Sequence, residues 1–384
     1  MKRAAAIMIA IAVAPASADP LRLRADALAS AQSPAGLLVL EADGKASATM
    51  NAEAVVWTAT DTADVLVIAL RARTPDGRIG GRVGRFVATL GALRPVHVDG
   101  AAARVRLGKR IDVEAYGGIP VLAFEHGMSE RAWDWVAGGR VARRLGDYGS
   151  VGVALLEQRD EARLATREVG VDAGLAIDKH HDVGSRFAYD LANPGIADVY
   201  ASVIRRKKKV RSELYGGYRA ASHLLPATSL FTVLGDTPSA RGGLLVSGKV
   251  APRLELTSDI GLRGASDELG ALLVVRARLA LDDDFKSALT GELRRDGVGD
   301  DAWTGARGAA RIALPRSFVA STELELVIPD TDRDKGRVWP WALAALGWER
   351  DVWRAACAVE ASASAQYRHR VDVLLSIARQ WGAP

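Results

Sequence analysis

The stretch AAARVRLGKRIDVEAYG, residues 101–117, has the two-faced pattern of a β-hairpin. If the chain reverses at Gly108–Arg110, Val105 lies opposite Val113 on an apolar face. The other face then carries two pairs of opposite charge, Arg106 with Asp112 and Arg104 with Glu114. Directly opposed pairs each stabilise an antiparallel ladder by roughly 0.2–1 kcal/mol, and a short loop that contains glycine suits a hairpin. The stretch therefore predicts a hairpin with one apolar and one ionic face.

The same alternation recurs along most of the chain. Between residues 271 and 281, Leu273 and Val275 share one face, and Arg276 and Arg278 share the other. Similar two-faced segments are found at 64–73, 252–262, 303–314 and 317–328. A period of two residues is typical of strands and differs from the period of an amphipathic helix. The sequence therefore predicts an all-β protein.

The connections between these segments alternate in length. Short links are expected near 108–110, 205–208 and 248–251, and longer polar connections at 92–100, 118–134 and 220–241. Short turns on one rim and longer loops on the other are typical of transmembrane barrels. We predict a single closed antiparallel up-and-down transmembrane β-barrel of about 16–22 strands, with about 22 as the best count.

The N-terminus has the order of a secretory signal peptide. Lys2 and Arg3 precede the apolar run Ala4–Ala14, which is followed by Ala16-Ser17-Ala18. Cleavage is expected after Ala18, so that residues 19–384 form the barrel. Beyond this segment no apolar run approaches the ~20 residues that a membrane helix needs. A closed barrel is the other structure that satisfies every backbone hydrogen bond within lipid.

The charge and cysteine content exclude two classes of protein. The net charge is +5, and the loss of Lys2 and Arg3 with the signal peptide lowers it to +3. The basic residues are interleaved with acidic ones, which argues against nucleic-acid binding. Cys357 is the only cysteine, so an exported chain of this length cannot be a disulfide scaffold.

The mature chain resembles, over its whole length, the bacterial outer-membrane β-barrel proteins and is porin-like in architecture. The last segment fits this resemblance because its apolar residues alternate up to a terminal aromatic residue, at Val371, Val373, Leu375, Ile377 and Trp381. The resemblance implies a Gram-negative outer membrane, contact with its lipid, and recognition of the last strand by the barrel-assembly machinery. It implies no cofactor and leaves the oligomeric state open.

If the apolar faces contact lipid, the charged faces line the interior of the barrel. An Arg on the lipid side costs ~2–4 kcal/mol near the middle of the bilayer. The predicted lumen-lining residues are Arg71, Arg73, Arg104, Arg106, Asp112, Glu114, Arg253, Glu255, Arg276, Arg278, Arg307, Arg311, Glu323 and Glu325. An Arg-rich wall lowers the barrier to small anions. We therefore predict a passive pore for small polar or anionic solutes.

Two other functions fit the same pattern less fully. One is a closed or plugged barrel with a structural or surface-binding role, acting through loops 118–134 and 220–241. The other is a soluble exported β-sandwich or β-propeller that binds glycans, although a sandwich would need its strands to sort into two sheets over one core.

Two local motifs resemble sites of chemistry. Gly243–Lys249 has the spacing of a phosphate-binding loop, but Val250 replaces the required Ser or Thr and the segment has a strand pattern. Asp330, Asp332 and Asp334 resemble a calcium loop, but Trp341 stands where a bidentate Glu is needed, so a solvated acidic loop is favoured.

An outer-membrane hydrolase would need a Ser and a His brought together from strand ends. His180 and His223 are the candidates, each with a nearby Ser, but no local sequence motif supports either one. The prediction is therefore a protein that is not an enzyme.

Overall fold

The computed structural model describes residues 22–30, 37–59, 63–122, 130–131, 135–160, 162–220, 239–265, 268–284, 286–299, 302–330, 337–363 and 369–381. The strands are β1 (Arg22–Ser30), β2 (Leu37–Ser47), β3 (Met50–Thr58), β4 (Ala63–Arg73), β5 (Ile79–Ala88), β6 (Val96–Leu107), β7 (Ile111–Leu122), β8 (Glu130–Arg131), β9 (Val136–Arg144), β10 (Gly149–Asp160), β11 (Arg163–Ala176), β12 (His181–Asp190), β13 (Gly195–Lys207), β14 (Val210–Arg219), β15 (Ser239–Ala251), β16 (Leu254–Ala265), β17 (Glu268–Ala280), β18 (Ala288–Asp296), β19 (Trp303–Leu314), β20 (Phe318–Pro329), β21 (Trp339–Arg350), β22 (Trp353–Ser362) and β23 (Arg370–Trp381). The 3₁₀ turns η1 (Gly146–Tyr148) and η5 (Pro315–Ser317) join strands. No helix in these ranges is long and apolar enough to cross a membrane.

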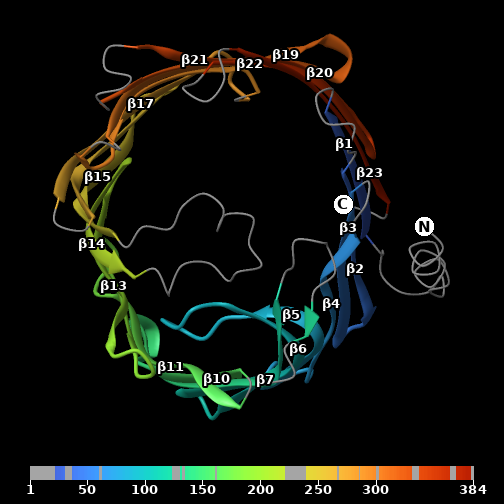
Figure 1. Ribbon diagram of the computed structural model, residues 1–384, viewed down its shortest axis with the longest axis vertical. Coiled ribbons are helices and arrows are strands. Elements are labelled where there is room, and N and C mark those ends of the chain that lie inside the picture. The colour runs from blue at the N-terminus through green and yellow to red at the C-terminus, as the bar shows by residue number, and fades with distance from the viewer. Residues whose placement is uncertain are drawn as a thin grey trace.

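The strands form one closed ring (Figure 1). Consecutive strands pair antiparallel, and β1 pairs with β23 from Leu23 opposite Trp381 to Ser30 opposite Leu374. The short β8 pairs only with the end of β7, so 22 strands make up the barrel. The predicted all-β, up-and-down barrel and its strand count are confirmed. The sandwich and propeller alternatives are wrong, because all the wall strands belong to one closed sheet.

The outer face of the barrel is apolar. On β17, Leu273, Val275 and Leu279 are 37%, 40% and 41% exposed, although in a packed core they would be buried. Arg276 and Arg278 alternate with them and therefore point to the other face of the sheet. The last strand repeats the pattern, with Val371, Leu375 and Ile377 all exposed.

Two of the expected connections are wrong in position. The predicted link at 248–251 is strand, because Lys249 pairs with Glu255 and Ala251 pairs with Leu254. The turn is instead at Pro252 and Arg253, where a proline, which has no N–H, does not interrupt a ladder. The link at 205–208 likewise begins later, since β13 continues to Lys207.

The predicted loop at 92–100 is also wrong. The connection occupies residues 89–95, and β6 already begins at Val96. The ends of β5 and β6, with this connection, leave the wall and cross the inside of the ring (Figure 1). We call residues 85–99 the inward hairpin. The sequence pattern did not predict this departure from the wall.

Three glycines lie side by side where the inward hairpin leaves the wall. Gly84 on β5 pairs with Gly100 on β6, which pairs with Gly118 on β7. A Cβ at any of them would overlap the neighbouring backbone, and Gly84 has a φ of +124°, which L side chains rarely adopt. The row of glycines permits the backbones to approach closely at the bend.

Replacement of Gly84 by alanine is expected to destabilise the barrel by about 2 kcal/mol or more, because the new Cβ meets the Ile68 carbonyl and the φ is strained. Gly80→Ala is the matched control, since its Cβ would lie 3.7 Å from the nearest atom, the Ala72 carbonyl oxygen. Urea unfolding of both variants in detergent checks the difference. Equal midpoints would contradict the role of Gly84 in the bend.

Candidate functional site: the lumen wall and the inward hairpin

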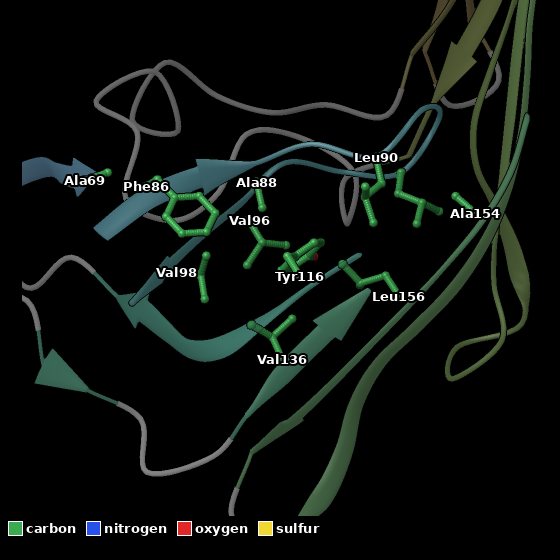
Figure 2. Close-up of a cluster of buried hydrophobic side chains, with 11 residues drawn as sticks. Ala69, Phe86, Ala88, Leu90, Val96, Val98, Tyr116, Val136, Ala154 and Leu156 are labelled. Carbon is green, nitrogen blue, oxygen red and sulfur yellow. The ribbon is translucent and has the colours of Figure 1, made fainter. Parts of the chain in front are cut away.

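The inward hairpin packs on the inner wall through apolar side chains. Phe86 and Val98 are 1% and 0% exposed, and they belong to a buried cluster with Tyr116, Val136 and Leu156. Figure 2 shows hairpin side chains pointing toward the wall residues of β7, β9 and β10. At roughly 25 cal/mol per Å² of apolar surface buried, such packing holds the hairpin against the wall.

An ion pair fastens the tip of the inward hairpin to β11. Arg94 Nε lies 3.3 Å from Glu168 Oε1, and the Glu168 side chain is fully buried. Arg94 also hydrogen-bonds to the Thr166 hydroxyl. A buried carboxylate is tolerated only when it is paired and hydrogen-bonded. The negative charge of Glu168 on the wall is therefore compensated by Arg94 of the hairpin.

A second ion pair lies directly under the tip. Arg140 on β9 and Asp172 on β11 are joined by bonds of 2.9 and 2.5 Å. Gly91 lies against them, and a Cβ at this position would overlap the Asp172 carboxylate. Gly91 also has a φ of +55°. The tip thus approaches the wall at a place where only a residue without a side chain fits.

The wall strand β4 loses its neighbour where the inward hairpin leaves, and hairpin side chains replace the missing backbone partners. Arg85 Nη1 donates to the Val65 carbonyl at 3.1 Å, and His97 Nε2 bonds to the Leu66 carbonyl at 2.7 Å. Arg85 is itself held by Asp99 at 2.7 Å. Buried carbonyls rarely remain without a donor. In its inward position the hairpin therefore supplies hydrogen-bond partners to two backbone carbonyls on the edge of β4.

The hairpin contacts identify which face of the sheet is the lumen. Arg140, under the hairpin tip, is directly opposite Glu114, and Glu114 is directly opposite Arg104. Directly opposed residues of a ladder lie on the same face. Directly opposed residues can be traced from strand to strand around the ring, and the trace shows that Arg276 and Arg307 lie on this same face.

Most of the sequence-predicted lumen residues lie in strands on this face, and many are paired. Their ion pairs are Arg71–Glu53 (2.7 Å), Arg104–Glu114 (3.3 Å), Arg106–Asp112 (3.4 Å), Arg278–Glu255 (3.9 Å), Arg276–Glu292 (2.5 Å) and Arg307–Glu323 (2.7 Å). Arg73, Arg311 and Glu325 lie on the same face. Arg253 differs, because it is in the turn after β15 and pairs with Asp283 of the next turn on that rim.

Several charged residues of this face did not enter the sequence prediction. They are Glu53, Arg140, Glu168, Asp172, Asp198 and Glu292. All of them except Glu168, which follows Arg167, alternate with apolar residues or glycine, so the same period-two pattern marks them in the sequence. Their degree of burial had no sequence signal, because it depends on partners from other strands.

The acidic loop candidate is only partly within the described residues. Asp330 pairs with Arg295, and Asp332 and Asp334 lie outside the described ranges. Among the residues that the structure describes, no group of three His, Cys, Asp or Glu side chains could hold a metal ion.

One histidine candidate, His180, lies at a turn. His180 is in the turn between β11 and β12, His181 is the first residue of β12, and His223 lies outside the described residues. The hydrogen bond from the His181 imidazole, with that from the His180 amide, lowers the pKa of Asp178 to about 2. His180 Nδ1 lies 2.9 Å from the Arg206 carbonyl oxygen. Both rings therefore stabilise the turn.

Solved structures with the same architecture were found at low sequence identity. The siderophore receptor PirA from Pseudomonas aeruginosa is 10% identical with a TM-score of 0.55, and the match covers 94% of this chain and 80% of PirA. The PapC usher translocation pore of the P pilus is 8% identical with a TM-score of 0.51, over 95% of this chain and 99% of that one. The chain has the fold of the large outer-membrane β-barrels. The ferric yersiniabactin uptake receptor FyuA from Yersinia pestis matches similarly, at 10% identity and a TM-score of 0.50, over 95% of this chain and 80% of FyuA. No protein-family model and no curated protein match the sequence of this outer-membrane-type barrel.

Proposed function

We propose that the chain is an integral outer-membrane β-barrel that conducts small polar solutes and favours anions. The observation that carries the proposal is the sorting of side chains, with apolar residues exposed outside and ion pairs on the lumen face. Apolar side chains exposed on a closed barrel are stable in lipid. An ionic wall is stable when it faces water or paired charges.

The size of the ring supports a passage. Side chains fill the interior of a barrel of about eight strands, whereas barrels of about 16–22 strands enclose a channel or a plugged lumen. This barrel has 22 strands, and the inward hairpin lies along the β7, β9, β10 and β11 side (Figure 1). In this proposal the hairpin narrows the passage for solutes.

A closed barrel with a structural or surface-binding role is the second candidate. The docking of the inward hairpin favours it, since the Arg94–Glu168 pair and the apolar cluster hold the hairpin across part of the lumen. The two candidates differ in conductance. Both candidate functions include export with cleavage of the signal peptide after Ala18 and insertion by the barrel-assembly machinery.

Purified barrel in planar bilayers, with a KCl gradient across the membrane, is expected to conduct and to favour chloride over potassium severalfold. The reason is the number of Arg side chains on the lumen face, which lower the barrier for anions. The reversal potential measures this selectivity. Conductance with cation preference would contradict the anion proposal, and folded protein without conductance would favour the closed barrel.

A further inference from the structure

A cavity of about 540 Å³ lies between the inward hairpin and the part of the wall near the short turns. Its wall comes from β3, β4, β5, β6 and β7, and Phe86 to Leu90 of the hairpin line its other side. Its volume is in the range of small-molecule sites, which are about 300–1,000 Å³. On the lumen face, the small residues Gly80 and Ala102 leave the space open.

The charged lining of this cavity is mainly basic. Four arginines line it, Arg71, Arg73, Arg82 and Arg104, with Glu114 as the one acidic residue of the lining. Guanidinium groups present a planar fork of donors that matches the two oxygens of a carboxylate. The cavity therefore has the composition of an anion site.

The arginines are not fully neutralised by nearby acids. Arg71 and Arg82 share one carboxylate, Glu53. Arg104 lies 3.3 Å from Glu114, which is also 4.0 Å from Arg140. It lies 3.5 Å from Asp112, which is also bound by Arg106 at 3.4 Å and Arg144 at 2.6 Å. Because each carboxylate is shared, positive charge is in excess at the cavity.

The guanidinium group of Arg73 remains available for a ligand. The Arg73 guanidinium forms no ion pair or hydrogen bond with any residue of the described part of the chain. Within the same described ranges, Arg82 Nε is buried and has no hydrogen-bond partner. The Arg82 guanidinium is also fixed over the Phe86 ring, 4.7 Å from its centroid.

We propose that this cavity binds a small organic dicarboxylate. The excess of guanidinium groups favours a dianion, and the apolar lining from Ala102 and residues 86–88 of the hairpin favours a carbon chain between the two carboxylates. The inference rests on the proposed channel function, since the lumen is the route by which the solute reaches the cavity. It adds to that function a saturable site beneath the inward hairpin.

Isothermal titration calorimetry of the purified full-length barrel in detergent tests the proposal. Succinate is expected to bind saturably, whereas 1,4-diaminobutane, which has a similar length and the opposite charge, is not. Arg73→Gln is expected to weaken succinate binding about tenfold, the loss typical of one charge-assisted hydrogen bond. Arg73 forms no ion pair with a carboxylate among the described residues, so its removal leaves none of those carboxylates without a partner. Circular dichroism verifies that the variant is folded.

Arg278→Gln is the matched control, because Arg278 lies on the lumen face of β17, away from the strands that line the cavity. Its succinate affinity is expected to equal that of the wild type. Equal loss in both variants, or no loss in Arg73→Gln, would overturn the site. Inorganic phosphate binding more tightly than succinate would overturn the choice of a dicarboxylate.

The same samples in planar bilayers separate this inference from the channel function. A barrel that conducts but does not bind succinate refutes the site and leaves the channel proposal intact. A barrel that binds succinate in an Arg73-dependent manner without conducting supports the site and refutes the channel.

Discussion

Replacement of Arg94 by alanine is expected to release the inward hairpin from the lumen wall. Arg94 pairs with Glu168, whose side chain is fully buried by the docked hairpin. Removal of one partner of a buried ion pair typically costs about 3–5 kcal/mol, because a buried charge loses its compensation. Undocking returns Glu168 to water, so we expect the hairpin to move while the rest of the barrel stays folded.

Disulfide trapping measures the docked fraction. A Cβ at position 170 on β11 would lie 3.2 Å from the Ala92 Cβ, close to the roughly 3.5–4.5 Å spacing of disulfides. The double variant Ala92→Cys/Gly170→Cys, with Cys357→Ala to remove the native thiol, is expected to oxidise readily. The oxidised fraction should fall severalfold when Arg94→Ala is added.

Two variants keep this test specific. Arg278→Ala removes a lumen arginine whose partner, Glu255, is 3.9 Å away and partly exposed, so the oxidised fraction is expected to remain high. Arg94→Met with Glu168→Leu removes both charges and is expected to restore docking, because an apolar pair can replace a buried ion pair. Equal trapping in all of these variants would show that the ion pair does not hold the hairpin.

Removal of the inward hairpin is expected to increase single-channel conductance about twofold or more, since conductance follows the width of the open lumen. The change replaces residues 86–98 by Asn-Gly, a dipeptide suited to a two-residue hairpin turn. Arg85 and Asp99 remain opposite each other, and their ion pair of 2.7 Å supports the new turn.

The trapped double-cysteine protein is the internal control for conductance. In its oxidised form it is expected to conduct like the wild type, because the disulfide fixes the hairpin where the structure places it. Unchanged conductance after removal of residues 86–98 would mean that the hairpin does not narrow the passage. The closed-barrel candidate predicts instead that conductance arises only after removal.

The sequence by itself determined the wall of this barrel. Alternation at segments such as 271–281 specifies both the strand and its lipid-facing side, because a period of two places every second side chain on the same face. Opposite charges such as Arg104 and Glu114 then set the partner strand and the register. These are local properties, and they were sufficient for the fold class and the strand count.

Only the tertiary structure decided what lies inside the wall. Phe86 and Val98 are apolar, and an apolar residue in a strand pattern fits lipid and a packed interior equally well. Glu168 is fully buried, and its partner Arg94, 74 residues earlier, reaches it from the folded hairpin. The row of Gly84, Gly100 and Gly118 exists only after three strands have paired. Such contacts join distant residues, so no local pattern contains them.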